Sequence, residues 1–234
     1  MRAWATVFPI VYDWIMALVE CIALARWRRS VVRPARGFVL EIGAGTGLDF
    51  PYYTTNATVV ATDLNVAMLR RGWERVVAAD ATILLVAADA EALPFRSASF
   101  DGAVVALAMC TIPHPKRALV ELRRVARPGA SVALLEHVRV HNAVIGRLQD
   151  WLTPLWRRLA GGCRLDRDTV RTVAESGLLV EEVTPHAGGS VVEVAARVPS
   201  GLAVTERAER RLSAPAVLSG TGAALLRPSR DCWP

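Results

Sequence analysis

Cysteine is scarce in this chain, and its spacing matches no metal-binding or redox motif. The four cysteines, Cys21, Cys110, Cys163 and Cys232, include no C-x-x-C pair. A zinc-ribbon or thioredoxin-like motif is therefore excluded, and we predict no metal ligands. The first apolar stretch also lacks a charged leader and a small-residue cleavage site, so a cleavable signal sequence is not expected. These features favour a cytoplasmic location, where thiols stay reduced.

Lysine is almost absent, because Lys116 is the only lysine among 28 basic residues. The chain therefore has no Tyr-x-x-x-Lys pair of the kind that one class of NAD-dependent oxidoreductases uses. Its net charge of +6 is of the sign that nucleic acids and anionic membranes attract. The arginines cluster only modestly, at 26–36 and 157–171, and Asp166 and Asp168 dilute the second cluster. We expect a solvated surface and no nucleic-acid partner.

Long uncharged apolar runs are also missing, although the N-terminal region comes close. The segment Trp4–Ala25 has the length of a membrane span, but Asp13 and Glu20 would be costly inside a bilayer. We therefore predict amphipathic helices that form an N-terminal cap over residues 1–36. The aromatic and arginine side chains at its ends leave peripheral contact with a membrane as an alternative.

The sequence contains a regular alternation of apolar strands and amphipathic helices. Strand patterns lie near residues 38–42, 58–62, 82–87, 101–107 and 130–138, and helix patterns near 46–53, 65–78, 115–126 and 167–176. This alternation predicts an α/β fold with a Rossmann-like, doubly wound and mostly parallel sheet. Leu178–Thr184 and Ser190–Val198 follow as two further strands, which we expect to be antiparallel at the sheet edge.

The alternation covers residues 37–198 and is interrupted once. A chain of 234 residues that is 53% hydrophobic can bury one full core, so we predict a single folded domain over this range. The interruption, at about 139–165, carries two tryptophans and is expected to form a lid over a substrate pocket, with Pro154 breaking any long helix. Residues 199–234 are rich in Pro, Gly, Ser and Arg, and are predicted to form a flexible tail.

The most informative segment is an apolar strand that runs into a glycine-rich loop, VLEIGAGTG at Val39–Gly47. The loop contains Gly43, Ala44, Gly45 and Gly47. Such a loop lets backbone N–H groups approach a ligand that a Cβ atom would push away. Leu48 stands where a dinucleotide-binding loop has its third glycine, which argues against an NAD-dependent oxidoreductase. The structural alternative is a tight turn between a strand and a helix.

Acidic residues come at the ends of three successive predicted strands. Glu41 ends the first strand, Asp63 follows the second and Asp89 follows the third. Because the carboxyl ends of parallel strands meet at one edge, these carboxylates would ring the crevice where open α/β sheets bind ligands. An acid beside the loop suits a cationic ligand such as S-adenosylmethionine better than a pyrophosphate. Each acid taken alone has an ordinary alternative, such as a helix cap.

As a set, four segments resemble a class I S-adenosylmethionine-dependent methyltransferase over residues 35–140. They are VLEIGAGTG (Val39–Gly47), ATDLNVAML (Ala61–Leu69), AADAEALPFRSASFDGAVV (Ala87–Val105) and ALVELRRVARPGA (Ala118–Ala130). The resemblance implies that the chain is an enzyme with S-adenosylmethionine as its cofactor.

The resemblance also implies which residues contact the cofactor. Gly43, Ala44, Gly45 and Gly47 would line its methionine and ribose, Asp63 would hold the ribose hydroxyls, and Leu64, Asp89 and Ala90 would hold the adenine. Glu41 would stand near the cationic end. Tyr12 resembles a tyrosine of the family's N-terminal helix that approaches the cofactor, although a buried core aromatic is an equal alternative.

The resemblance indicates the chemical class of the methyl acceptor but does not identify the molecule. Glu136–Val138 and Arg147–Val170 are similar to bacterial relatives of small-molecule thiol methyltransferases and, more distantly, to ubiquinone and phosphatidylethanolamine methyltransferases. This similarity implies a small lipophilic acceptor, namely a thiol, a quinol or phenol, or an amino-lipid. His137, at the end of the fifth predicted strand, is the best candidate for a catalytic base. A protein that binds the cofactor without turnover is the alternative, because methyl transfer needs few dedicated catalytic groups.

Overall fold

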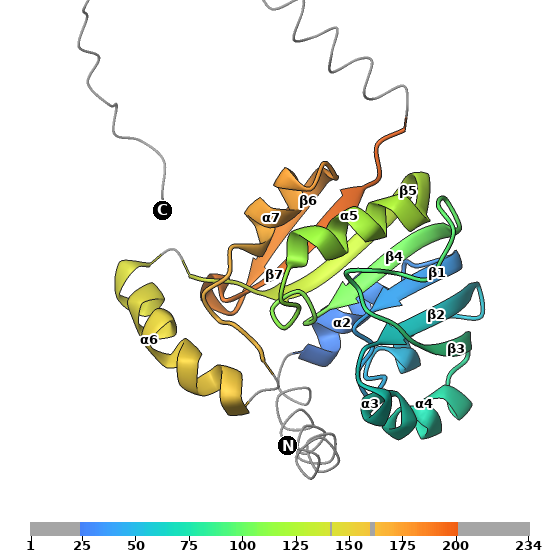
Figure 1. The fold of residues 1–234 in the computed structure, drawn as a ribbon, viewed down its shortest axis with the longest axis horizontal. Coiled ribbons are helices and arrows are strands. Elements are labelled where there is room, and N and C mark those ends of the chain that lie inside the picture. The colour runs from blue at the N-terminus through green and yellow to red at the C-terminus, as the bar shows by residue number, and fades with distance from the viewer. Residues whose placement is uncertain (1–23, 141, 160–161, 201–234) are drawn as a thin grey trace, which may run out of the picture. The chain divides into compact units, whose positions relative to one another are not determined.

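The computed structural model describes residues 24–140, 142–159 and 162–200, which form a seven-stranded sheet flanked by helices (Figure 1). The strands are β1 (Gly37–Ile42), β2 (Ala57–Asp63), β3 (Thr82–Ala87), β4 (Phe100–Ala106), β5 (Ala126–His137), β6 (Leu179–His186) and β7 (Val191–Arg197). The helices are α2 (Ala25–Val32), α3 (Val66–Arg71), α4 (Trp73–Val77), α5 (Pro115–Val125), α6 (Ala143–Leu159) and α7 (Thr169–Glu175), with short 3-10 helices η2 (Phe50–Tyr52) and η3 (Ala187–Gly189).

The strand order is β3-β2-β1-β4-β5-β7-β6. Strands β1 to β5 pair in parallel, whereas β7 is antiparallel to both of its neighbours, β5 and β6. The predicted doubly wound sheet with an antiparallel edge is therefore confirmed. The order reverses around β1, which lies between β2 and β4, and ligands of such sheets bind at the carboxyl ends of the strands at this point.

The strands are apolar on both faces because helices cover both faces. On one face, Leu40 and Ile42 of β1 belong to a core that includes Leu122 of α5. On the other face, Val39 belongs to a second core that includes Val32 of α2. Continuous apolar strands of this kind are typical of parallel sheets.

Two predicted helices between β1 and β3 differ in the structure. The helix predicted over 46–53 is replaced by turns followed by the short η2. Gly47 has a φ of 78°, which an α-helix does not allow, and Pro51 supplies no amide to a longer helix. The pattern over 65–78 is divided into α3 and α4 at Gly72.

Helix α6 occupies most of the segment predicted as a lid, and it continues through Pro154 instead of breaking there. Proline removes one backbone donor from a helix. Much of α6 is exposed, so water can hydrogen-bond the carbonyl group that Pro154 leaves without an amide partner. In the same turn, the Thr153 hydroxyl donates to the Gln149 carbonyl at 2.7 Å.

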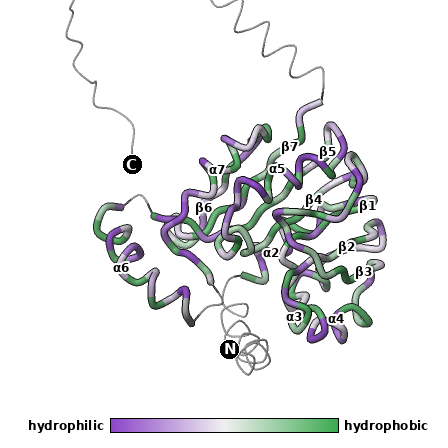
Figure 2. Tube along the Cα trace, viewed as in Figure 1, coloured by the Kyte–Doolittle hydropathy of each residue, from purple (hydrophilic) through white to green (hydrophobic). Residues whose placement is uncertain are grey.

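Helix α6 also carries half of the large apolar side chains that the described surface exposes. Figure 1 shows the helix set off from the sheet, and Figure 2 shows hydrophobic stretches along it as well as in the central strands. These exposed residues are Val144, Ile145, Leu148, Trp151, Leu152, Leu155 and Trp156. Within the described ranges, no helix has both the length and the apolar character that a membrane crossing requires.

Parts of two predicted regions fall outside the described residues. Of the N-terminal cap predicted over 1–36, the structure describes only the part from Leu24 onward, which includes α2. Tyr12 lies outside the described residues, as does the tail beyond residue 200.

Candidate active site

Two adjoining cavities lie at the carboxyl ends of the parallel strands. The cavity beside β2 and β3 measures about 560 Å³, and the cavity beside β4 and β5 measures about 220 Å³. Both are lined by Gly43, Asp63, Asn65, Ala108 and Thr111. The two cavities therefore belong to one site, at the position that the strand order predicts.

The glycine loop is held in shape by hydrogen bonds within the protein. The amides of Gly43 and Ala44 donate to the Thr62 carbonyl, at 2.8 and 2.9 Å. The Gly45 amide donates to Asp63 Oδ2 at 2.9 Å. Contrary to the expectation that the loop presents its amides to a ligand, these three amides have partners in the protein. The loop instead supplies a fixed, narrow wall.

Two glycines of the loop are required for different steric reasons. Gly43 has a φ of 72°, and a Cβ atom there would lie 2.3 Å from the Ala108 Cβ across the site. Gly47 has a φ of 78°, and its Cβ would lie 2.4 Å from the Phe50 ring. Gly43, Ala44 and Gly45 line the smaller cavity, whereas Gly47 lines neither cavity. The close packing of the Phe50 ring therefore explains why position 47 requires a glycine.

Asp63 occupies the central position of the site. Its Oδ1 accepts the Asn65 amide at 2.7 Å, while its Oδ2 accepts the Gly45 amide. The alternative that Asp63 caps the following helix is wrong, because the N-cap of α3 is Asn65. Burial raises the pKa of Asp63, and the two amide hydrogen bonds act against this increase. A carboxylate has about four lone-pair positions, so acceptor capacity is left for a ligand.

The remaining residues predicted to hold the adenine lie together in the larger cavity. Leu64, Asp89 and Ala90 all line it. The Leu64 side chain is 72% exposed. Asp89 is also exposed, and its Oδ1 accepts the Glu91 amide at 2.8 Å. The structure thus brings Asp63 and Asp89 to one edge of the sheet, as predicted.

The prediction that Glu41 rings the crevice together with Asp63 and Asp89 is wrong, because Glu41 is buried beneath the loop and lines neither cavity. Its side chain is buried, with both carboxyl oxygens lacking a hydrogen-bond partner. Burial raises the pKa of Glu41 well above its ordinary value, and the charge of Asp49 raises it further, whereas Tyr53 and Arg28 lower it. Asp49 is paired with Arg28 at 2.8 Å, and this buried pair does line the smaller cavity.

The smaller cavity contains a cluster that the sequence did not indicate. Cys110 follows β4, His137 ends β5 and Cys163 follows α6, and all three line the cavity together with Trp156. The ligand atoms of Cys110, His137 and Cys163 all lie within 4.8 Å of one another. His137 Nδ1 is buried without a hydrogen-bond partner. Hydrogen bonding with Cys110 lowers the pKa of the Cys163 thiol, and His137 contributes in the same direction.

Glu136 holds the loop that carries Cys110. It is fully buried, and its Oε1 accepts the amides of Ala108 and Met109 at 2.9 and 2.8 Å. Its Oε2 accepts the Cys110 amide at 3.3 Å. Burial raises the pKa of Glu136 to about 7, although these amides lower it. Three amides on one carboxylate fix the backbone beside Gly43.

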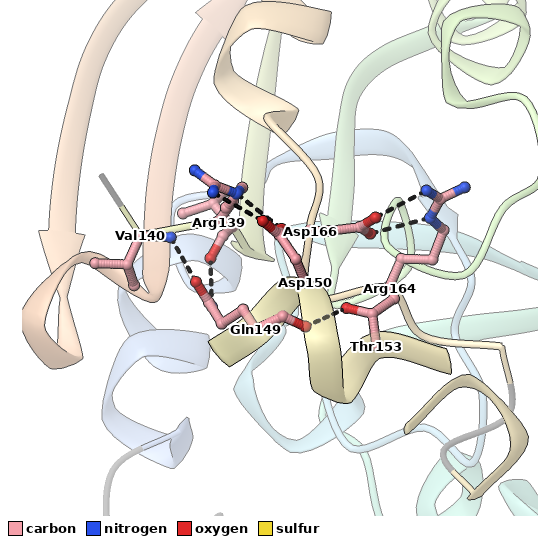
Figure 3. Close-up of polar contacts among 8 residues, drawn as sticks. Arg139, Val140, Gln149, Asp150, Thr153, Arg164 and Asp166 are labelled. Atoms are coloured by element: carbon pink, nitrogen blue, oxygen red, sulfur yellow. Dashed lines mark hydrogen bonds and ion pairs between the residues drawn. The ribbon is translucent and has the colours of Figure 1, made fainter. Parts of the chain in front are cut away.

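Helix α6 is held against the residues that follow β5 by polar contacts, which Figure 3 shows. Arg139 donates to both carboxyl oxygens of Asp150 at 2.9 Å. The Val140 amide donates to Gln149 Oε1 at 2.8 Å. Both carboxyl oxygens of Asp150 thus accept hydrogen bonds from Arg139, and Asp150 lines neither cavity. This aspartate is therefore a poor candidate for a catalytic base.

Several site residues escaped the sequence reasoning because only the fold brings them together. Arg28, Asp49, Cys110, Cys163 and Trp156 come from separate elements, and no local spacing connects them. Only the adjacent pair Glu136-His137 at the end of an apolar strand gave a signal, and it drew attention to the histidine alone.

Comparison with known proteins agrees with this arrangement. Residues 40–134 match a family described as methyltransferase domain. A phosphatidylethanolamine N-methyltransferase of Cereibacter sphaeroides is 31% identical, over 66% of this chain and 76% of that protein. A ubiquinone/menaquinone biosynthesis C-methyltransferase of Burkholderia vietnamiensis is also 31% identical, over 77% of this chain and 84% of that protein. A demethylmenaquinone methyltransferase of Renibacterium salmoninarum is 37% identical, but this match spans only 47% of that protein.

Solved structures of distant relatives show the same fold. A methyltransferase of Thermotoga maritima superposes with a TM-score of 0.61 at 16% identity, over 83% of this chain and 98% of that one. A methyltransferase of Aquifex aeolicus gives a TM-score of 0.53 at 20% identity, over 69% of this chain and 81% of that one. The glycine loop, the two acids and the sequence relatives together place the chain in the class I S-adenosylmethionine-dependent methyltransferases, enzymes that use S-adenosylmethionine as the methyl donor.

Proposed function

We propose that this enzyme methylates a small lipophilic acceptor that enters the smaller cavity from the side of α6. The observation that carries the proposal is the apolar surface of α6, which continues into the cavity lining through Trp156. Two relatives are named for acting on phosphatidylethanolamine and demethylmenaquinone, and both names describe lipid-soluble molecules. A thiol, a quinol or phenol, and an amino-lipid all fit this description.

The larger cavity is the proposed seat of the nucleoside half of S-adenosylmethionine. Asp63 has acceptor capacity left for ribose hydroxyls, and Leu64 and Ala90 offer apolar surface to the adenine. The narrow space at Gly43, which a Cβ atom would fill, supports a ligand that passes between the two cavities. When bound, S-adenosylmethionine supplies an activated methyl group on a sulfonium.

The smaller cavity is the proposed seat of the methionine end and of the acceptor. Arg28 and Asp49 provide one charge of each sign, which matches the carboxylate and ammonium groups of a zwitterion. His137 lines the same cavity, and its buried Nδ1 has no partner, so it is placed to take a proton from the acceptor. The protein otherwise positions the acceptor and excludes water.

The first experiment separates the cofactor from the acceptor. Calorimetric titration should show one S-adenosylmethionine bound per chain and no binding of NADH. Formation of S-adenosylhomocysteine is then measured with a panel of lipophilic thiols, quinols and amino-lipids, each paired with a water-soluble analogue of the same head group. Turnover that is faster with the lipophilic member of a pair supports the proposal, and equal rates for both members would contradict it.

A further inference from the structure

The cluster in the smaller cavity combines three residues that are far apart in the chain. Cys110 is 1% exposed and Cys163 is 7% exposed, and His137 ends β5 and lines the same cavity. Their ligand atoms lie within 4.8 Å of one another. Two buried thiols and an imidazole nitrogen without a hydrogen-bond partner are thus gathered at one point of a cavity wall.

We infer that Cys110, His137 and Cys163 form a binding site for a soft divalent metal ion of the Zn²⁺ type, with a fourth coordination position open to the cavity. Thiolate and imidazole are the ligands that zinc prefers. Tetrahedral zinc with bonds of about 2.3 Å to sulfur keeps two sulfurs roughly 3.8 Å apart. The three ligand atoms, which lie within 4.8 Å of one another, can therefore close around an ion through small side-chain rotations.

The backbone around the cluster is fixed before any ion arrives. The Arg164 amide donates to the Cys110 carbonyl at 3.0 Å, which holds the residue after Cys163 against the loop after β4. Glu136 accepts three amides of that loop, the last being that of Cys110. Supports of this kind orient the ligands of a metal and strengthen its binding.

Three protein ligands with one open position are typical of catalytic zinc sites, whereas structural sites have four. The open position faces the cavity in which the acceptor is proposed to bind, so this role rests on the proposed function. An acceptor thiol or phenol that coordinates there would lose its proton to solvent, because the ion's charge stabilises the anion. His137 would then act as a metal ligand, and loss of the acceptor's proton would need no protein base.

The test uses the full chain with Cys21→Ser and Cys232→Ser, so that every remaining thiolate belongs to the cluster. Co²⁺ serves as a spectroscopic probe under a reductant that does not bind metals. We expect one Co²⁺ per chain with a thiolate-to-metal charge-transfer band, and displacement of Co²⁺ by one equivalent of Zn²⁺. Adding Cys163→Ser or Cys110→Ser should weaken binding at least about tenfold, since each removes one ligand, and near-ultraviolet circular dichroism checks that each variant is folded.

The outcomes separate this inference from the proposed function. If the chain with only Cys110 and Cys163 binds S-adenosylmethionine but gives no charge-transfer band, the metal site is refuted and the proposed function stands. A stable Cys110–Cys163 disulfide, detected by mass spectrometry in place of metal binding, would also refute it. If Cys110→Ser fails to fold, His137→Gln provides the same test, because it removes the nitrogen ligand and keeps both thiols.

Discussion

The two halves of the site are built in different ways. The half at β1, β2 and β3 is made of residues at the ends of successive strands: Asp63 ends β2, whereas Gly43 and Asp89 follow β1 and β3. The half at β4 and β5 is made of residues that meet only through the fold, namely Arg28 of α2, Cys110, and Cys163 after α6. The residues of the first half can be recognised from local sequence motifs. The residues of the second half come together only because α2 and the lid segment pack against the sheet.

Under the proposed function, this difference separates the part of the site that binds a constant ligand, the methyl donor, from the part that binds a variable one, the acceptor. Every member of the family binds the same donor, so a fixed loop held by Asp63 suits it. Acceptors differ between members, and a wall contributed by α6 changes without disturbing the sheet. Substitutions in the two halves should therefore have separable effects on donor and acceptor.

The largest effect is expected at the narrowest point of the donor half. Gly43→Ala places a Cβ atom 2.3 Å from the Ala108 Cβ at a φ of 72°. We expect the affinity for S-adenosylmethionine to fall more than about a hundredfold, which is about 2.7 kcal/mol, in calorimetric titration. Gly129→Ala is the matched control, because Gly129 also has a positive φ, of 82°, but has nothing within 4 Å of the added Cβ. It should lose about 1 kcal/mol of stability and keep the affinity; equal losses in both variants would contradict the steric argument.

The next effect is expected at Asp63, which supports the loop and lines both cavities. Asp63→Ala removes the acceptor for the amides of Gly45 and Asn65. We expect about a thirtyfold to hundredfold loss of affinity for S-adenosylmethionine, or about 2 to 3 kcal/mol. Asp89→Ala, which leaves the loop intact, should lose less, about fivefold. Calorimetry on both variants checks the order, and a larger loss at Asp89 would overturn the central role of Asp63.

Beneath the donor half, Glu41 should make stability depend on pH. Burial holds the pKa of Glu41 above its ordinary value in the folded chain. At a pH between the pKa values of the unfolded and the folded chain, the folded chain therefore binds more protons than the unfolded chain. The free energy of unfolding therefore falls as pH rises through this interval, by up to about 1.4 kcal/mol per pH unit. Glu41→Gln mimics the protonated carboxyl and should remove the part of the fall that comes from Glu41, so the variant is more stable than the wild type at neutral pH. The part that comes from Glu136, whose pKa burial raises to about 7, should remain.

Urea unfolding from about pH 4 to about pH 8 measures this dependence. The matched control is Glu74→Gln, which changes an exposed glutamate of α4 and should follow the wild-type profile. A Glu41→Gln variant that is less stable than the wild type at neutral pH would show instead that Glu41 is ionised and stabilised by Arg28.

The smallest effects are expected on the acceptor half, where two tryptophans of α6 provide a matched pair. Trp156 lines the cavity, whereas Trp151 is 75% exposed and lines neither cavity. Trp156→Ala should raise the KM for a lipophilic acceptor about fivefold, or about 1 kcal/mol, through lost apolar contact. Trp151→Ala should leave that KM unchanged and weaken sedimentation with anionic lipid vesicles, if α6 meets a membrane. The reverse pattern would show that the acceptor does not enter beside Trp156.

The sequence predicted the sheet and the places of Asp63 and Asp89 well, and it did so for a physical reason. Parallel strands buried on both faces must be apolar throughout, and a residue at a strand's carboxyl end is at the site by topology, which located Asp63 and Asp89. The region after Gly47 was predicted less well, because Phe50 and Pro51 replace a helix by η2. The continuation of α6 through Pro154 depends on solvent exposure, which a local pattern does not reveal.

The acceptor half could not be predicted from spacing. Cys110 and Cys163 meet because one backbone hydrogen bond joins the Arg164 amide to the Cys110 carbonyl. Motif reasoning searches for ligands that are close in sequence, so it found no reason to pair these cysteines with each other or with His137. Contacts of this kind become visible only when the lid segment is placed on the sheet.

The closed shape of the glycine loop has a consequence for the enzyme's cycle. Because Asp63 and Thr62 already hold its amides, the loop needs little ordering when the nucleoside arrives. S-adenosylhomocysteine carries the same nucleoside as the donor, so the spent cofactor should be retained nearly as firmly as the fresh one. Turnover would then be governed by how quickly the spent cofactor is removed from its surroundings, and the enzyme would respond to the ratio of the two forms.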